Sequence, residues 1–391
     1  MSYPSNLPHL LWVGLMSPDH NLNAAPWLNI TRELRNLGWR VSLVVVGPSG
    51  KQTYNGTEVF CISVPKIYFF GLTYFHLKLL QLIYQQRHEI DVVLFNQGSV
   101  SWLIPLRFLR ILLRKSRPLF IMDTRSVHMP LQSKQGWKGL LRGYYMALMN
   151  QIANRWADGL TAITTMMVNT LKMPSKKVLG VWPSGVDLTL FSPARVNRQW
   201  PVANDPIRLV YIGTLEYERN IDSFCKAVKL ANSEGMSFIF TIIGEGKQRS
   251  ELETLASNSQ GRIIVKPPVP HLEIPQILAK ENIGVLPFPD EEKFRVSSPI
   301  KLFEYMAAGL PILASRIVCH TDVIGDHDIA FWAEQSDLDG FMLALRQLWS
   351  RRNCLCEMSI QAALLANDWT WHESAKKLDV ALKKALNDSF H

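Results

Sequence analysis

Short apolar runs alternate with longer helical patterns along the first half of the chain. The run at 40–47, RVSLVVVG, is continuous and β-branched, as expected for a strand covered on both faces. The predicted strands of this half are 9–17, 40–47, 91–96, 118–123, 159–164 and 177–182, and the predicted helices are 24–37, 72–88, 99–115 and 137–157. Such alternation predicts a parallel sheet with helices on both faces.

Residues 191–207 interrupt this alternation with three prolines among mixed polar residues, which is typical of a linker. The pattern then restarts, with strands predicted at 208–213, 236–244, 262–267, 282–288 and 310–315 and helices at 219–232, 247–257, 271–280, 299–308, 335–350 and 356–388. The sequence therefore predicts an α/β protein with two tandem Rossmann-like domains, each an open parallel sheet. We expect domains at 1–190 and 208–368, with 369–391 as a C-terminal helix.

Composition agrees with two globular domains. The 391 residues are 47% hydrophobic and 19% charged, which excludes a disordered chain. The net charge of +9 is concentrated in residues 1–190, which hold 20 Lys and Arg against 8 Asp and Glu. This asymmetry predicts an anionic partner surface, either nucleic acid or an anionic membrane. Nucleic acid is not favoured, because the basic stretch 101–117 is mostly aliphatic and lacks interleaved stacking aromatics.

The same basic stretch suggests a membrane contact. Arg107, Arg110 and Arg114 share one face of the predicted helix, beside a very apolar remainder. One interpretation is a helix that lies on an anionic membrane. The alternative is an internal crossover helix whose arginines reach solvent.

The five cysteines favour a reducing compartment, because they are odd in number, scattered and without a CxxC pair. The N-terminus has no basic segment of the kind that opens a signal peptide. The most apolar stretch, 68–84, is interrupted by His76 and Lys78, so it is not predicted to span a membrane. We expect a cytoplasmic protein that is peripheral on the inner face of the membrane.

The strongest candidate for chemistry is the segment 297–315, SSPIKLFEYMAAGLPILAS. Pro299 suits the first turn of a helix, whose free N–H groups suit a diphosphate. Lys301 and Glu304 are three residues apart and share a helix face, where Glu304 could accept hydrogen bonds from the two hydroxyls of a ribose. The alternative is an ordinary amphipathic helix with a solvated Lys–Glu pair.

Two further segments follow predicted strands in the second half. In 211–224, a strand ends at Gly213, and Arg219 precedes a helix at a place where it could reach a ligand phosphate. The alternative is a surface arginine. Gly244 belongs to a GxG pair, but Arg249 occupies the third glycine position of a dinucleotide fingerprint, so a tight turn is the better interpretation.

In the first half, Asp123 and Arg125 directly follow a predicted strand, and His128 is a further candidate for proton transfer. The alternative is a capping Asp with a salt-bridged Arg. The acidic triplets at 326–328 and 337–339 have too few oxygen ligands for a hard cation, so no metal site is predicted.

Three stretches in a fixed order resemble family 4 of the nucleotide-sugar-dependent glycosyltransferases, also called group 1, which have the two-domain GT-B fold. They are PSGVDLTLFSP at 183–193, YIGTLEYERNIDSF at 211–224 and SPIKLFEYMAAGLPILAS at 298–315. The resemblance implies two domains that face a central cleft, with the last helix crossing back to the first domain. It also implies sugar transfer from a nucleotide-diphosphate donor with retention at the anomeric carbon and no required metal or other cofactor. Together with the membrane interpretation of the first half, this leads us to expect an acceptor that is lipid-linked or a growing surface polysaccharide.

The resemblance also implies roles for individual residues. Arg219 matches the family's phosphate-binding basic position, Lys301 is a second cation for the same phosphate, and Glu304 matches the glutamate that holds the donor ribose. The other expected donor-binding residues are Gly213, Thr214, Gly244, Ser297, Ser298, Pro299 and Ile300. On the acceptor side the candidates are Asp123 and Arg125 as catalytic residues, with Asn23 and His128 beside them.

Two departures from the family pattern leave other functions open. Val296 stands where many relatives have the first glutamate of an E-x7-E pair, so the donor sugar contact is expected from Ser297 or Ser298. Thr214 replaces an arginine that often follows the strand-end glycine, so Lys301 would compensate. The alternatives are a nucleotide-sugar epimerase of the same fold and a catalytically inactive subunit that binds nucleotide sugar.

Overall fold

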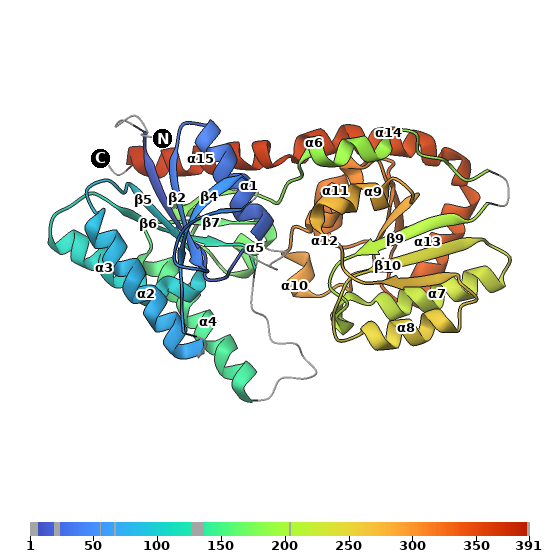
Figure 1. Cartoon of the computed structure of the whole chain (residues 1–391), viewed down its shortest axis with the longest axis horizontal. Coiled ribbons are helices and arrows are strands. Elements are labelled where there is room, and N and C mark those ends of the chain that lie inside the picture. Colours follow the sequence, from blue (N-terminus) through green and yellow to red (C-terminus); the bar gives the residue numbers. More distant parts are fainter. Residues whose placement is uncertain are drawn as a thin grey trace. The chain divides into compact units, whose positions relative to one another are not determined.

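The chain divides into two compact units, Met1–Pro183 with Trp371–His391, and Ser184–Thr370. The computed structural model, shown in Figure 1, describes residues 7–18, 24–54, 56–65, 68–126, 137–202 and 205–388. The sequence analysis placed the corresponding domain ends at residues 190 and 368. The residues 191–207 that it assigned to a linker belong to the second unit.

An eight-stranded sheet forms the centre of the first unit, in the order β3-β4-β2-β1-β5-β6-β7-β8. The strands are β1 His9–Val13, β2 Arg40–Val46, β3 Gly50–Tyr54, β4 Thr57–Ile62, β5 Val92–Phe95, β6 Leu119–Thr124, β7 Gly159–Ala162 and β8 Val178–Val181. Every pairing is parallel except that of the edge strand β3 with β4. The apolar runs of the sequence form the buried strands, whereas the β3–β4 hairpin was not predicted.

Helices cover both faces of this sheet, as the alternation predicted (Figure 1). They are α1 Ala24–Asn36, α2 Tyr68–Gln85, α3 Val100–Leu112, α4 Trp137–Trp156, α5 Thr165–Thr170 and α15 Trp371–Asp388. The C-terminal helix α15 packs against α1 and β8. Trp39 Nε1 donates a buried 2.6 Å hydrogen bond to Asp379 Oδ1 on α15. The last helix therefore belongs to the first unit, as the family resemblance implied.

The arginines of α3 lie in an environment that neither interpretation of the sequence predicted. Arg107 Nε and Arg110 Nη2 lie 2.7 and 2.9 Å from Asp158 Oδ1. Their side chains are only 20% and 10% exposed. These two arginines form ion pairs within the unit and present no basic face, because α3 turns them toward the β6–β7 side of the fold.

The second unit contains a six-stranded, wholly parallel sheet in the order β11-β10-β9-β12-β13-β14. The strands are β9 Ile207–Ile212, β10 Phe238–Ile243, β11 Ile263–Lys266, β12 Ile283–Leu286, β13 Ile312–Ser315 and β14 Ala330–Ala333. The helices are α6 Leu188–Phe191, α7 Ile221–Ser233, α8 Arg249–Ser257, α9 Ile274–Leu278, α10 Glu292–Arg295, α11 Ile300–Ala307, α12 Val318–Ile324, α13 Leu338–Ser350 and α14 Leu355–Leu365. Both predicted Rossmann-like sheets are confirmed, and β14 was missed.

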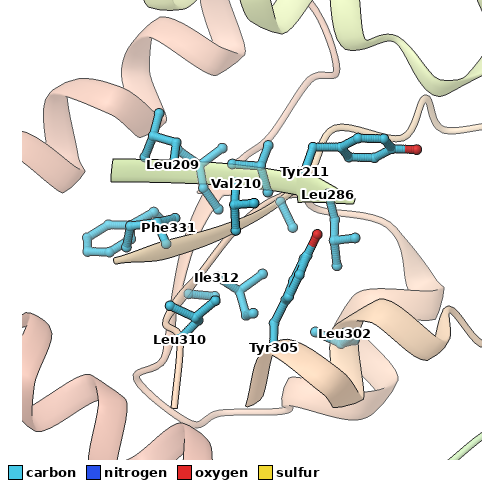
Figure 2. Packing of buried hydrophobic residues seen from close by; sticks show 14 of the residues in the cluster. Leu209, Val210, Tyr211, Leu286, Leu302, Tyr305, Leu310, Ile312 and Phe331 are labelled. Carbon is cyan, nitrogen blue, oxygen red and sulfur yellow. The ribbon is translucent and has the colours of Figure 1, made fainter. Parts of the chain in front are cut away.

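Helix α11 is held tightly against the second sheet. Figure 2 shows Tyr305 rising from α11 toward β9, where its buried hydroxyl accepts a 3.0 Å hydrogen bond from Ile212 N. A Cβ atom on Gly284 of β12 would lie 2.3 Å from Cδ2 of the Tyr305 ring, so the glycine allows this close approach. The result is a fixed position for α11, which carries Lys301 and Glu304.

Candidate functional site

Three segments that the sequence analysis singled out meet at the carboxyl edge of the second sheet. The Lys301 side chain extends from α11 along Gly213, which follows β9. A Cβ atom on Gly213 would lie 2.3 Å from Lys301 Cε and 2.9 Å from its Nζ. Ser184 N, from the turn before α6, donates a 3.0 Å hydrogen bond to Ser298 Oγ. In parallel α/β sheets, ligands bind at this edge.

Arg219 lies at the same edge, as the last residue of the 3-10 turn η4, Tyr217–Arg219. Its guanidinium carbon is 5.1 Å from the ring centroid of Phe288 and 5.2 Å from that of Phe294. Neither Arg219 nor Lys301 makes a side-chain hydrogen bond or an ion pair with any residue that the structure describes. Both cations therefore have donors available for a ligand.

Two neighbouring cations, Lys293 and Arg295, are paired. Lys293 forms an ion pair with Glu218, and Arg295 Nε lies 2.6 Å from Asp290 Oδ1. Arg219 and Lys301 differ from these two cations in having no carboxylate partner among the described residues.

Lys301 is held in an environment that disfavours its charge. Desolvation by the surrounding protein lowers the pKa of the half-buried ammonium, and the positive charge of Arg219 lowers it further, while Glu304 opposes both effects. A bound anion would relieve the desolvation and the repulsion together. The arrangement is therefore suited to a phosphate or diphosphate group.

Glu304 has a partner that the sequence analysis missed. The residue is only 8% exposed, and its Oε1 lies 2.8 Å from His271 Nε2. His271 begins the 3-10 turn η5, His271–Glu273, after β11, and its ring meets Phe191 edge-on at 5.5 Å. The hydrogen bond to Glu304 raises the pKa of His271, against the opposing effect of burial. The only signal for His271 in the sequence was its position after a predicted strand.

The glycines at this edge are explained by close packing. A Cβ atom on Gly244 would lie 1.7 Å from the carbonyl oxygen of Gly213, so no side chain fits there. Gly213 N donates a 2.9 Å hydrogen bond to Ile243 O, which ties the ends of β9 and β10 together. Thr214 lies in the same turn, and its carbonyl accepts a 3.0 Å hydrogen bond from the Tyr211 hydroxyl.

The remaining donor-side positions lie at the start of α11. Pro299 is the N-cap residue and Ile300 the first helical residue. Ser297 Oγ donates a 2.7 Å hydrogen bond to Phe294 O, so both serine hydroxyls, with that of Ser298, take part in bonds within the fold. Val296 is buried and adds no polar group. The donor-sugar contact expected from Ser297 or Ser298 stays a prediction.

On the acceptor side, Asp123 and Arg125 both contact Trp182 of the first unit. The buried Asp123 Oδ1 accepts hydrogen bonds of 2.7 Å from Thr161 Oγ1 and 2.9 Å from Trp182 Nε1. The Arg125 guanidinium carbon lies 3.6 Å from the Trp182 ring centroid, and Nη1 donates a 2.9 Å hydrogen bond to Trp182 O. Burial raises the pKa of Asp123 to about 6, although Arg125 and both hydrogen bonds oppose the shift.

Two predicted acceptor-side residues, Asn23 and His128, lie outside the described residues. Within the described ranges, no group of three or more His, Cys, Asp or Glu is placed to hold a metal ion. In the same ranges, no helix is both long enough and apolar enough to cross a membrane.

Comparison with known families identifies the class of protein to which this two-sheet fold belongs. Residues 27–190 match the family model described as Glycosyltransferase Family 4, and residues 206–351 match the model described as Glycosyl transferases group 1. These matches cover most of the chain. The chain belongs to this glycosyltransferase family, and its two parallel-sheet units are those of the GT-B fold.

Among curated relatives, the chain is 30% identical over 150 residues to the GDP-mannose-dependent alpha-(1-6)-phosphatidylinositol dimannoside mannosyltransferase of Mycobacterium tuberculosis, a match that covers 36% of each chain. It is 26% identical over 149 residues to the amylovoran biosynthesis glycosyltransferase AmsK of Erwinia amylovora, covering 37% of this chain and 36% of that protein. The chain spans less than half the length of the curated relatives that it matches.

Solved structures share the fold over nearly the whole chain. Sucrose-phosphate synthase from Thermosynechococcus elongatus superposes with a TM-score of 0.77 at 12% identity, covering 97% of this chain and 100% of that one. HepE from Anabaena, solved in complex with UDP, has a TM-score of 0.70 at 12% identity, and the match covers 97% of this chain and 100% of that one. At 12% sequence identity, the structural similarity to these proteins establishes the fold alone.

Proposed function

We propose that the protein transfers a sugar from a nucleotide-diphosphate donor to an acceptor, with retention of anomeric configuration and without a required metal. The second unit binds the donor: Arg219 and Lys301 contact the diphosphate, and Glu304 holds the ribose. The first unit binds the acceptor, for which Asp123 and Arg125 are the candidate residues. Family membership and the solved complex of HepE with UDP support a nucleotide-sugar donor.

The observation that carries this proposal is the pair of cations at the carboxyl edge of the second sheet. Arg219 and Lys301 have no hydrogen-bond or ion-pair partner among the described residues, although Lys301 is desolvated. Such preorganised cations supply two charges to an incoming anion without breaking an existing ion pair.

The chemistry fits this arrangement. When the bond between the sugar and the diphosphate breaks, negative charge grows on the β-phosphate oxygen. Fixed positive groups aimed at that oxygen lower the barrier, and removing one such donor typically costs about 10²–10³ in rate. Arg219 and Lys301 would provide the charge stabilisation that a metal ion provides in other transferases, which supports the proposed metal independence.

We place the reaction in polysaccharide or glycolipid biosynthesis, with a lipid-linked or saccharide acceptor. The names of the relatives support this: one acts on a phosphatidylinositol dimannoside and another functions in amylovoran biosynthesis. We also propose a cytoplasmic location at the inner face of the membrane. The five cysteines are all free thiols, which fits a reducing compartment.

The experiment is a thermal-shift screen of the whole chain with a panel of nucleotide sugars. A ligand present at 100 times its Kd stabilises a protein by about 2.7 kcal/mol, which is readily measured. Incubation of the best donor without an acceptor then separates the alternatives, because an epimerase converts the donor alone. Stabilisation without turnover under any acceptor condition would identify an inactive binding subunit, and no stabilisation by any nucleotide sugar would contradict the proposal.

A further inference from the structure

We propose that helices α2, α3 and α4 of the first unit form a surface that docks onto an anionic lipid bilayer. We call the exposed side of these helices the three-helix face. More than half of the large apolar side chains that are exposed in the described part of the chain belong to these three helices. The inference rests on the first unit alone and is independent of the donor-binding proposal.

The three helices form one continuous layer on the sheet. His76 of α2 stacks on Trp102 of α3, with ring centroids 5.1 Å apart. Ser101 Oγ of α3 lies 3.1 Å from the Tyr145 hydroxyl of α4. Figure 1 shows the three helices gathered on the same side of the first unit, away from α1 and α15. Their exposed side chains therefore belong to a single surface.

The exposed apolar residues of this face are mostly leucines and aromatics with large exposed fractions. Leu112 at the end of α3 is 79% exposed, and Tyr144 in the middle of α4 is 75% exposed. Leu77 of α2, Leu109 of α3 and Leu140 of α4 are also exposed. Contiguous apolar patches that exceed a few hundred Å² are rare on soluble monomers and mark interaction sites. Tyrosine and leucine together suit the boundary between lipid headgroups and acyl chains.

The charge of the face identifies the partner. Helices α2, α3 and α4 contain no Asp or Glu in their 18, 13 and 20 residues. Arg107 and Arg110 are paired with Asp158, but Arg142 and Arg155 of α4 are exposed. Apolar side chains among cations, with no carboxylate on the helices, match an anionic bilayer, which offers both acyl chains and negative headgroups. A protein partner of mixed charge would gain nothing from the absence of carboxylates.

The test is co-sedimentation of the full chain with vesicles of phosphatidylcholine alone or mixed with phosphatidylglycerol. The variant is Leu112→Glu with Tyr144→Glu, which places two carboxylates on the face. The matched control is Leu343→Glu with Ile360→Glu, on α13 and α14 of the second unit, where these side chains are 58% and 60% exposed. Both double variants shift the net charge of the chain by the same negative amount. Thermal unfolding measurements check that each variant is folded.

We expect the wild type to bind the phosphatidylglycerol vesicles and the face variant to lose at least tenfold in binding, while the control binds as the wild type does. Raising the salt concentration should weaken wild-type binding, because the cations act through the negative headgroups. Three results would each overturn the proposal: no binding of the wild type to anionic vesicles, an equal loss in the control, or concentration-dependent self-association that the face variant abolishes. Donor-induced thermal stabilisation, measured in parallel, reports separately on the second unit.

Discussion

Polar side chains gather at the carboxyl edges of both sheets, but their surroundings differ. At the end of β6 in the first unit, Asp123 and Arg125 are both bonded to Trp182. At the end of β9 in the second unit, Arg219 and Lys301 have no such partner among the described residues. Both sites lie at the carboxyl ends of parallel strands, where ligands bind in α/β proteins. The topology alone therefore does not distinguish them.

This difference in pairing indicates which polar groups are available to bind a ligand. Buried polar groups are normally hydrogen-bonded, because leaving one unpaired costs free energy. Asp123 satisfies this rule through Thr161 and Trp182, whereas Arg125 Nη2 is buried without a hydrogen-bond partner among the described residues. Lys301 is desolvated without any paired carboxylate, which is a cost that a bound anion would remove. The four predictions below test this contrast, from the largest effect to the smallest.

The largest effect is expected from removal of a cation at the second edge. Arg219→Gln and Lys301→Gln should each lower the transfer rate by about 10²–10³, the cost of one lost donor to a developing anion. Steady-state kinetics with the donor found in the screen measures this. The control is Arg316→Gln at the end of β13, because Arg316 is already paired with Glu334 at 3.1 Å. Equal losses in all three variants would mean that the unpaired cations have no special role.

Two glycine variants should separate the site from the fold. In Gly213→Ala, the new methyl group meets the flexible end of Lys301, so the ammonium moves. We expect activity to fall by more than tenfold, with a smaller loss of stability than in Gly244→Ala, although the φ of +158° at Gly213 is strained for any residue with a side chain. In Gly244→Ala the methyl group meets backbone, and we expect a loss of about 1–3 kcal/mol in stability, as for overpacking. Thermal unfolding and steady-state kinetics on the same samples measure the two effects. Unchanged activity in Gly213→Ala would contradict the proposed position of the Lys301 ammonium in the site.

Asp123→Asn tests the first edge, since an amide oxygen can still accept both hydrogen bonds. Burial raises the pKa of Asp123 from 3.8 to about 6, so ionisation costs stability as pH rises through this range. The variant should therefore match the wild type near pH 4 and exceed it above pH 6, by on the order of 2 kcal/mol. Denaturant unfolding at several pH values measures the difference. A fall in transfer rate of more than tenfold would support the catalytic role predicted for Asp123.

The smallest effect is expected at the partner of Glu304. The hydrogen bond to Glu304 raises the pKa of His271, so the pair contributes stability below the ordinary histidine pKa and loses it as pH rises through the raised value. His271→Gln should lower Tm by a few degrees at pH 6 and by less at pH 9. Donor affinity should change by less than tenfold, because we propose that Glu304 and not His271 contacts the ribose. A Tm difference that grows with pH would contradict this assignment.

Much of the fold could be predicted from the sequence because buried parallel strands are continuous apolar runs. The edge strand β3, GKQTY, was missed because an edge strand needs no such run. The predicted helix 356–388 is divided near Thr370 into α14, η7 and α15. Both sides of this break have helical periodicity, so the pattern could not show it.

The candidate site was predictable where residues lie close in sequence, and not where a contact joins distant segments. Lys301 and Glu304 share one turn of α11, and the motif predicted that both would be present at the sheet edge. The contact of His271 with Glu304 spans 33 residues, and no local pattern indicates it. Arg107 and Arg110 were misjudged for the same reason, since Asp158 lies beyond β6 and α4 in the chain.

The central claim is that the carboxyl edge of the second sheet binds a nucleoside diphosphate through Arg219 and Lys301. Titration calorimetry with UDP, GDP and ADP tests it most directly. We predict that at least one of them binds the wild type and the Arg316→Gln control alike, and that the variant carrying both Arg219→Gln and Lys301→Gln binds it at least 100-fold more weakly. Equal affinity in the wild type and the double variant, or no binding to the wild type at all, would contradict the account.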